Sequence, residues 1–479
     1  MDKTVCCHPK SYWNGKHLLL GLVFWLFIQG CYAKQPVIRV LFVGDILLSR
    51  NVRSEIQTRN TSPWEVLQPF FKSASLVIGN LEGAVGKRED QFLSKSDSPV
   101  FAIDSADIRL LGDAGFNTIT LGNNHRLDLG EIGRQKTINA LQNCGITPVT
   151  PENSPQFFTV KNLVIAVVTI NMIPGRDFSK DQVPSVGLKQ KLRLAQSLSN
   201  LVVVSIHWGS ELLSWPNRSQ REAATWLVGN GADIIIGHHP HVIQKPEMIN
   251  GKPVFFSLGN HLFDQKYPET KTGLIVEMLI QNGKAQCRGI LTHTQQNSFY
   301  PEIIKNQDFK LNAIELRNNA LEINGYQLRP KSVSETGQPK IILEAFQNGE
   351  KQWKTPPMSL VMIGSGKLDD RRDYLFTLEN HYSSLDKENS LRPYVYDIDR
   401  KGLFAKWRGS ALAWPLLDAL LLPANPTIVC ALHRGDSFIN PDKSATNNRV
   451  AAYRWNGFGF KGVSDSTTCE SCRKLLIKE

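Results

Sequence analysis

The stretch VIRVLFVGD (37–45) is an apolar, β-branched run that stops at Gly44 and Asp45. An apolar run of about 4 to 8 residues that ends at glycine or a turn is typical of a buried β-strand. The pattern returns five more times, and each return ends in histidine, asparagine or a carboxylate. The returns are SLVIGNLE (75–82), FNTITLGNNHRLD (116–128), LVVVSIHWGSE (201–211), ADIIIGHHPH (232–241) and PVFFSLGNHLFD (253–264).

Four stretches between these runs have the apolar spacing of amphipathic helices. They are 105–114, 130–144, 189–198 and 218–228. Strand and helix alternate from about 37 to 277, which is the pattern of a layered α/β domain. If the strands share a sheet, their ends converge on one rim, where ligands bind in open α/β sheets. The pattern therefore predicts one polar site built from the strand ends.

The composition is that of a globular protein that attracts anions. A chain of 479 residues is long enough for about two or three domains. The 55 Lys+Arg against 44 Asp+Glu give a net charge of +11, which favours acidic partners such as envelope polymers or lipid headgroups. No zinc finger, basic-aromatic stripe or RNA-binding signature accompanies this charge, so we expect no nucleic-acid partner.

The N-terminus has the features of an export signal. Three lysines precede the apolar stretch 18–28, which is too short to span a bilayer comfortably and suits a signal-peptide core. The sequence IQGC (28–31) resembles a lipoprotein box with Cys31 as the lipidated residue, whereas CYA (31–33) offers the small residues that a signal peptidase reads. An uncleaved anchor is the third alternative. All three predict an extracytoplasmic protein, either secreted or membrane-anchored.

After about residue 300 the pattern changes. The stretches 331–340 and 355–357 are typical of linkers, and short aromatic strands follow from 360 onward. We therefore predict four parts, namely a signal peptide or anchor over 1–33, the α/β domain over 37–300, a connecting region over 301–357 and a small β-rich C-terminal module over 358–479. Cys469 and Cys472 form a lone CxxC near the end, which favours a local disulfide or no bond over a zinc site.

The strand ends offer nitrogen and oxygen donors for a metal. Borderline transition metals bind imidazole nitrogen and carboxylate oxygen, several of which must meet at one point. The candidates are Asp45, Glu82, Asn124, His125, His207, His239 and His241. Because no thiol is among them, they suit a hydrolytic site with one or more divalent Mn, Fe or Zn ions better than a structural zinc site.

The clusters also resemble a known family. Asp45 after its strand, followed by GNLE, GNNHxxD, HWGxE, GHHPHVxQ and SLGNxxFDQ, is similar to the ordered motifs of the CapA family of poly-γ-glutamate capsule biosynthesis proteins, which is related to the calcineurin-like metallophosphatases. The resemblance covers roughly residues 37 to 300. It implies an α/β fold, specifically a metallophosphatase-like β-sandwich flanked by helices with its site at the strand ends.

The resemblance also implies a role for each strand-end residue. His125 matches the histidine that protonates the leaving group. The metal ligands that it implies are Asp45, Glu82, Asn124, His207, His239 and His241. His238 is then an extra histidine that supports the ligands without binding the metal. Leu47 departs from the phosphatase pattern, which has a histidine there, and Glu82 replaces a shorter aspartate.

Further polar residues beside these ligands have supporting roles. Asp128 either orients His125 or caps the following helix. Metal-bound imidazoles usually donate their other N–H to a partner, and Glu211, Asn260 and Asp264 are candidates for such partners.

Two functions fit these observations. The first is an exported CapA-like hydrolase or transferase that uses its metal site on an anionic polymer, such as poly-γ-glutamate, or on a cell-envelope precursor. The second is a non-catalytic membrane-associated scaffold that binds the polymer or a polymer-synthesis complex, which Leu47 favours. A serine hydrolase is not expected, because the chain has no G-x-S-x-G motif.

Overall fold

Two β-sheets, rather than one, contain the six apolar runs. The computed structural model describes residues 37–87, 99–175, 177, 179–318, 321–333, 339–368, 372–383, 387–408, 412, 416–435 and 447–477. The predicted signal segment 1–33, with Cys31, lies outside these residues. Among them, no helix is both long and apolar enough to cross a membrane.

The first sheet has nine strands in the order β18-β17-β16-β1-β2-β5-β6, with β15 beside β1 and β19 beside β17. Its strands are β1 (Ile38–Ile46), β2 (Leu76–Leu81), β5 (Thr118–Thr120), β6 (Thr147–Val149), β15 (Asn260–Leu262), β16 (Thr272–Gln281), β17 (Lys284–Thr294), β18 (Pro301–Lys310) and β19 (Ile314–Glu315). Strands β1, β2, β5 and β6 are parallel, and β15 is parallel to β1.

The second sheet has six strands in the order β12-β13-β10-β9-β8-β7. Its strands are β7 (Gln156–Val160), β8 (Leu163–Asn171), β9 (Leu201–His207), β10 (Ile234–His238), β12 (Glu247–Ile249) and β13 (Lys252–Phe255). The four central strands are parallel, and β7 and β12 are antiparallel edges. This region also contains two short strand pairs and a 3-10 helix, namely β3 (Ala84–Val85) with β4 (Ala102–Ile103), β11 (Ile243–Gln244) with β14 (Ser257–Leu258), and η2 (Pro268–Lys271).

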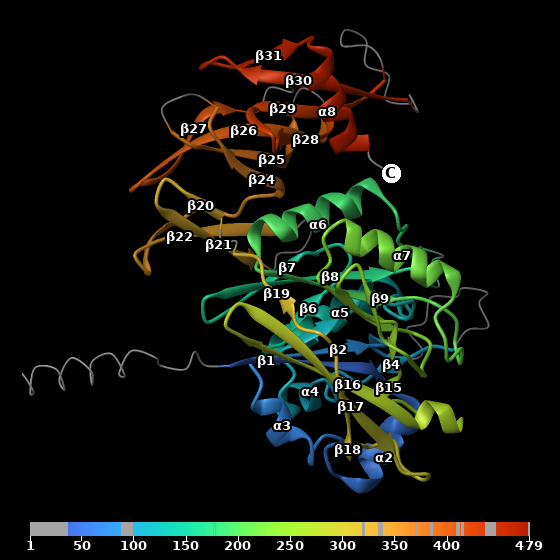
Figure 1. Ribbon diagram of the computed structural model, residues 1–479. Coiled ribbons are helices and arrows are strands. Elements are labelled where there is room, and N and C mark those ends of the chain that lie inside the picture. The colour runs from blue at the N-terminus through green and yellow to red at the C-terminus, as the bar shows by residue number, and fades with distance from the viewer. Residues whose placement is uncertain are drawn as a thin grey trace, which may run out of the picture. The chain divides into compact units, whose positions relative to one another are not determined.

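The two sheets pack face to face with helices on their outer faces (Figure 1). On β1, Val40 and Phe42 join the core between the sheets, whereas Leu41 and Val43 pack with the helices. This burial of both faces explains why the strands are apolar runs without polar alternation. Helices α2 (Arg50–Arg59), α3 (Gln68–Lys72), α4 (Arg109–Ala114) and α5 (Gly130–Asn143) cover the nine-stranded sheet, and α6 (Val186–Leu198) and α7 (Arg218–Gly229) cover the six-stranded sheet. The fold is therefore α/β.

The C-terminal part of the chain is rich in antiparallel strands. Three four-stranded sheets are formed by β20 (Leu321–Ile323), β21 (Tyr326–Val333), β22 (Lys340–Gln347) and β23 (Glu350–Lys354), then by β24 (Leu360–Gly366), β25 (Tyr374–Ser383), β26 (Glu388–Asp399) and β27 (Gly402–Arg408), and then by β28 (Leu416–Leu422), β29 (Asn425–Arg434), β30 (Asn448–Trp455) and β31 (Phe460–Val463). The segment 301–357 thus contains β18 and the first of these sheets. The division of the chain at 300 and 357 stays a prediction.

Helix α8 (Ser466–Ile477) follows the last strand, and its cysteines pair differently from the prediction made from the sequence. Cys472 is buried and forms a disulfide with Cys430 on β29, 42 residues away, while Cys469 is free. The prediction of a local disulfide between Cys469 and Cys472 is therefore wrong. The physical reason is that α8 buries Cys472 in an apolar cluster that also contains Cys430.

Candidate metal centre

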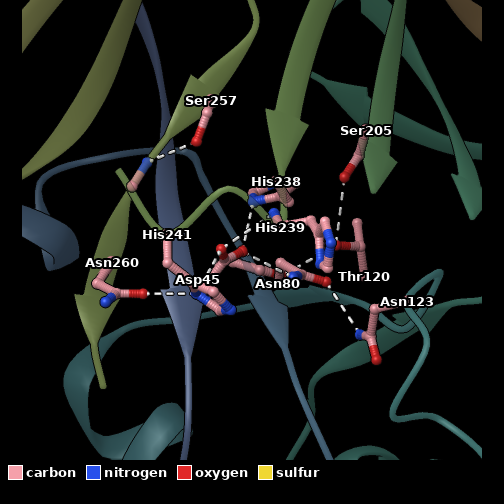
Figure 2. A network of polar contacts seen from close by, with 12 residues as sticks. Asp45, Asn80, Thr120, Asn123, Ser205, His238, His239, His241, Ser257 and Asn260 are labelled. Carbon is pink, nitrogen blue, oxygen red and sulfur yellow. Dashed lines mark hydrogen bonds and ion pairs between the residues drawn. The ribbon is translucent and has the colours of Figure 1, made fainter. Parts of the chain in front are cut away.

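The carboxylate of Asp45, near the end of β1, lies at the centre of the polar cluster (Figure 2). Asn80 Nδ2 donates to its Oδ1 at 2.9 Å, and His238 Nδ1 lies 3.0 Å from the same oxygen. The backbone N–H of His239 donates to Oδ2 at 3.2 Å, and His241 Nδ1 lies 3.4 Å from that oxygen. Burial raises the pKa of Asp45, but the hydrogen bond and charge of His238 and the charge of His241 outweigh it, so the pKa is lowered. Asp45 is therefore an anion.

Glycines allow the strand ends to approach this closely. A Cβ on Gly44 would collide with the carbonyl oxygen of Gly259, and the backbone N–H of Asp45 donates to that same oxygen at 3.0 Å. A Cβ on Gly237 would collide with the carbonyl oxygen of Phe256. These two contacts explain why apolar runs stop at glycine just before the functional residues, since only glycine permits such a backbone approach.

A strained turn after β10 presents two histidines to the centre. His239 has φ 95° and His241 has φ 59°, values that residues other than glycine rarely adopt. Both side chains are buried. Backbone strain of this kind, about 1 to 3 kcal/mol for each residue, persists where the surrounding structure enforces it and often marks a functional site.

Glu82, which follows β2, is a buried carboxylate without a partner. Neither of its oxygens accepts a hydrogen bond from any described residue. Burial raises its pKa well above the ordinary value, and the charges of Asp45, Glu211 and Asp128 raise it further. One donor atom each from Glu82, Asp45 and His241 lie within 4.8 Å of one another. An added cation would satisfy this carboxylate directly.

His207, at the end of β9, is in a similar state. Neither ring nitrogen has a hydrogen-bond partner in the described part of the chain, and its ring centroid lies 4.8 Å from that of His239. Burial lowers its pKa well below the ordinary value, and the neighbouring histidines lower it further. Burial also lowers the pKa of His239 to about 3. Both imidazoles are therefore neutral, which is the form that binds metals.

Two further residues singled out from the sequence offer oxygen donors. The side-chain oxygen of Asn124 is buried without a partner among the described residues. Glu211 is exposed, and one of its oxygens lies within 4.8 Å of donor atoms of His239 and His241. The structure thus contains two overlapping groups of candidate ligands that share His241. Carboxylates and imidazoles in such groups fit a divalent metal ion.

His125 and Asp128 form a buried pair beside these groups. His125 Nδ1 lies 2.9 Å from Asp128 Oδ2, which also accepts a hydrogen bond from the backbone N–H of Phe101 at 2.7 Å. The ring of Phe101 stacks on His125 with centroids 3.9 Å apart. Helix α5 begins after Leu129 without a side-chain cap, so Asp128 orients His125 and does not cap the helix. With Nδ1 held by Asp128, Nε2 is the ring nitrogen available for proton transfer.

The predicted supporting residues separate into two groups. His238 contacts Asp45, and Asn260 Oδ1 lies 2.8 Å from His241 Nδ1, so both orient residues of the centre. Asp264 instead forms an ion pair with Arg50, and its side chain accepts from the backbone N–H of Asn51 at 3.3 Å. No role was predicted for Arg50 from the sequence. In the structure its guanidinium lies 4.8 Å from the ring centroid of Phe101.

Two asparagines connect β2 to His125 and also had no predicted role. Asn123 Nδ2 donates to Asn80 Oδ1 at 3.1 Å and to the carbonyl of Leu81 at 2.8 Å, and its own Oδ1 accepts from the backbone N–H of His125 at 3.1 Å. The only sequence signal for them is the repeated Gly-Asn at the end of several runs. By contrast, His261, which shares such a motif, accepts a hydrogen bond from Trp64 Nε1 at 3.0 Å and lies in the core.

Comparison with known proteins identifies similar sequences. The profile of the family described as "Bacterial capsule synthesis protein PGA_cap" matches residues 39–265. The capsule biosynthesis protein CapA of Bacillus anthracis is 30% identical over 309 residues, which are 58% of this chain and 75% of that protein. The PGA biosynthesis protein CapA of Bacillus subtilis (strain 168) is 30% identical over 264 residues, which are 52% of this chain and 69% of that protein.

Solved structures show only weak similarity. A hypothetical protein from Thermus thermophilus has a TM-score of 0.32 at 19% identity and covers 56% of this chain and 99% of its own. Vps29 of Entamoeba histolytica, solved in complex with Zn²⁺, has a TM-score of 0.23 at 11% identity and covers 46% of this chain and 96% of its own. At these scores neither structure bears on fold or function.

Proposed function

This chain belongs to the bacterial capsule synthesis (PGA_cap) family, and from that premise we propose that it is an exported, metal-dependent hydrolase or transferase of capsule or poly-γ-glutamate biosynthesis. The family membership confirms the resemblance predicted from the six ordered motifs. Involvement in capsule biosynthesis follows from the CapA relatives, and the metal-dependent reaction and the export are the proposal.

The observation that carries the proposal is the set of buried donors without partners around Asp45. Both oxygens of Glu82 and both nitrogens of His207 lack hydrogen-bond partners among the described residues. A buried polar group without a partner costs about 1 to 3 kcal/mol, and more when it is charged. A divalent ion bound by these groups would remove that cost, which is why we infer a metal here. The two face-to-face sheets with outer helices support a metallophosphatase-like form of the α/β fold.

The residues divide between holding the metal and moving a proton. Asp45, Glu82, Asn124, His207, His239 and His241 would hold the ion. A bound divalent metal supplies Lewis-acid chemistry to a phosphoryl or carbonyl oxygen. His125 would donate a proton from Nε2 to the leaving group, and Asp128 would fix the orientation of the ring. Phe101, stacked on His125, excludes water from one side of the ring.

A non-catalytic scaffold that binds the polymer or a synthesis complex is the second candidate. The observation that favours it is Leu47, which is fully buried and packs with Phe101 and Phe263 in a small apolar cluster. The phosphatase pattern has a histidine at this position, so one ligand of a two-metal site is missing here. Under this alternative the fold and the polymer partner stay the same, and His125 has no chemical role.

Export is supported by the disulfide between Cys430 and Cys472. Disulfides persist in oxidising compartments outside the cytoplasm and are rare within it. Secretion, lipidation at Cys31 and an uncleaved anchor are all compatible with this argument, because the leader lies outside the described residues.

Two measurements test the proposal. Protein purified from the envelope should contain Mn, Fe or Zn by elemental analysis, and His239→Ala combined with His241→Ala should abolish both metal and function. Complementation of a capsule-deficient strain then separates the two candidates, because an enzyme requires His125 and a scaffold tolerates His125→Ala. Metal-free protein with full activity would exclude the metal-dependent reaction.

A further inference from the structure

A basic hollow of about 790 Å³ lies in the segment that follows Asn260 and Asp264. Its lining residues are Lys266, Pro268, Lys271, Thr294, Gln296, Asn297 and Phe299. They offer two ammonium groups, two amides and one hydroxyl, and no carboxylate is among them. The volume falls within the range of roughly 300 to 1,000 Å³ that is typical of small-molecule sites.

An aromatic ring positions Lys271 in the hollow, and Glu55, the acid with the largest effect on the pKa of this lysine, is bound to other partners. Lys271 Nζ lies 4.8 Å from the ring centroid of Phe299, which fixes the ammonium over the aromatic face. Glu55 accepts hydrogen bonds from Ser298 Oγ and from the backbone N–H of Phe299, both at 2.8 Å, and forms an ion pair with Arg59. Burial lowers the pKa of Lys271 and the charge of Lys266 lowers it further, whereas the charges of Glu55 and Asp264 raise it without reversing the shift, so a bound anion would favour the charged form of this lysine.

Hydrogen bonds connect the hollow to the metal centre through Asn260. Its Oδ1 lies 2.8 Å from His241 Nδ1, while its Nδ2 donates to Gln265 Oε1 at 3.0 Å and to the carbonyl of Thr270 at 3.3 Å. Gln265 and Thr270 directly precede the two lysines in the chain. The position of the hollow is therefore fixed relative to His241.

We propose that this hollow is a binding subsite for the carboxylates of a polyanionic chain, and that it holds the polymer while the reacting bond lies at the metal centre. The inference rests on the proposed function for the identity of the polymer, which the CapA relatives suggest is poly-γ-glutamate. Lys266 and Lys271 pair with successive carboxylates, and Gln296 and Asn297 donate further hydrogen bonds.

Binding of a fluorescent γ-glutamate pentamer to the full chain tests this subsite, with Mn²⁺ present and absent. The test variant is Lys266→Gln with Lys271→Gln. The matched control is Lys401→Gln with Lys461→Gln, which removes the same charge from two exposed lysines in the turn after β26 and on β31. The test variant should raise the dissociation constant for the pentamer about tenfold or more and weaken its salt dependence, and the control should leave both unchanged.

The possible results distinguish failure of the subsite from failure of the proposed metal-dependent reaction. Equal loss of binding in the test and control variants, or no loss in either, would overturn the subsite. Tighter, lysine-dependent binding of inorganic tripolyphosphate than of the pentamer would overturn its assignment to carboxylates. The metal content of the test variant should equal that of the unmodified protein. Lysine-dependent binding together with full activity in the absence of metal would exclude the metal-dependent reaction and leave the subsite standing.

Discussion

Replacing Glu82 by glutamine should have opposite effects on the protein with and without metal. Glu82 is fully buried, and one of its oxygens lies within 4.8 Å of a carboxylate oxygen of Asp45. Burial and the charge of Asp45 raise the pKa of Glu82, so the folded protein without metal binds a proton that the unfolded chain releases, at a cost of about 1.4 kcal/mol for each pKa unit. Glutamine has nearly the same shape and is neutral without a bound proton, so it removes this cost. We therefore expect Glu82→Gln to raise the free energy of unfolding of the metal-free protein by about 1 to 3 kcal/mol.

The sign should reverse once metal is added. A metal at about one hundred times its dissociation constant stabilises the folded protein by roughly 2.7 kcal/mol, and loss of an anionic ligand reduces that gain. The assay is urea unfolding at pH 7 in EDTA and then in excess Mn²⁺ or Zn²⁺. Glu65→Gln, which removes an exposed carboxylate, should change stability by less than about 0.5 kcal/mol in both conditions. Destabilisation of Glu82→Gln in EDTA would refute the view that Glu82 is a buried carboxyl without a partner that a cation would stabilise.

Three other perturbations test separate parts of the structure. Asp128→Asn should lower turnover by about 10- to 100-fold with unchanged metal content, because the ring of His125 loses its orienting carboxylate; equal turnover would show that the pair is structural only. Burial lowers the pKa of His261 from 6.5 to about 3. As the pH falls, the unfolded chain therefore takes up a proton at this histidine before the folded protein does, and the free energy of unfolding decreases by about 1 kcal/mol from pH 7 to pH 5.5. His261→Gln should flatten that part of the pH profile of urea unfolding, whereas an unchanged slope would contradict the assignment. Combined Cys430→Ser and Cys472→Ser should lower the free energy of unfolding by about 4 kcal/mol through loss of a 42-residue loop, and a loss below about 1 kcal/mol would contradict the bond.

The strands and their terminal clusters were predictable because burial on both faces forces apolar runs, and close backbone contact forces glycine at their ends. Gly44 and Gly237 are the positions where that requirement is strictest. The apolar pattern alone did not predict which run joins which sheet of the sandwich, since a strand buried on both faces has the same pattern in either sheet. Helix α2 was missed because only Val52 and Ile56 of its ten residues are buried.

The candidate site was predictable at the level of residue type and less so at the level of contacts. His261 and His241 each follow a Gly-containing turn, yet His261 lies among the aromatic rings of Trp64 and Phe71 and His241 lies at the centre. Only the three-dimensional environment separates them. Arg50 was missed for the same reason, because its partner Asp264 is 214 residues away in the chain.

Whether this protein is a metal-dependent enzyme is decided by the metal content of the exported protein, measured together with its activity on phosphate esters and γ-glutamyl amides. We predict bound Mn, Fe or Zn, turnover of one of these two substrate classes, and loss of both metal and turnover in the His239→Ala, His241→Ala double variant. Protein that contains no metal and retains full activity would contradict the account.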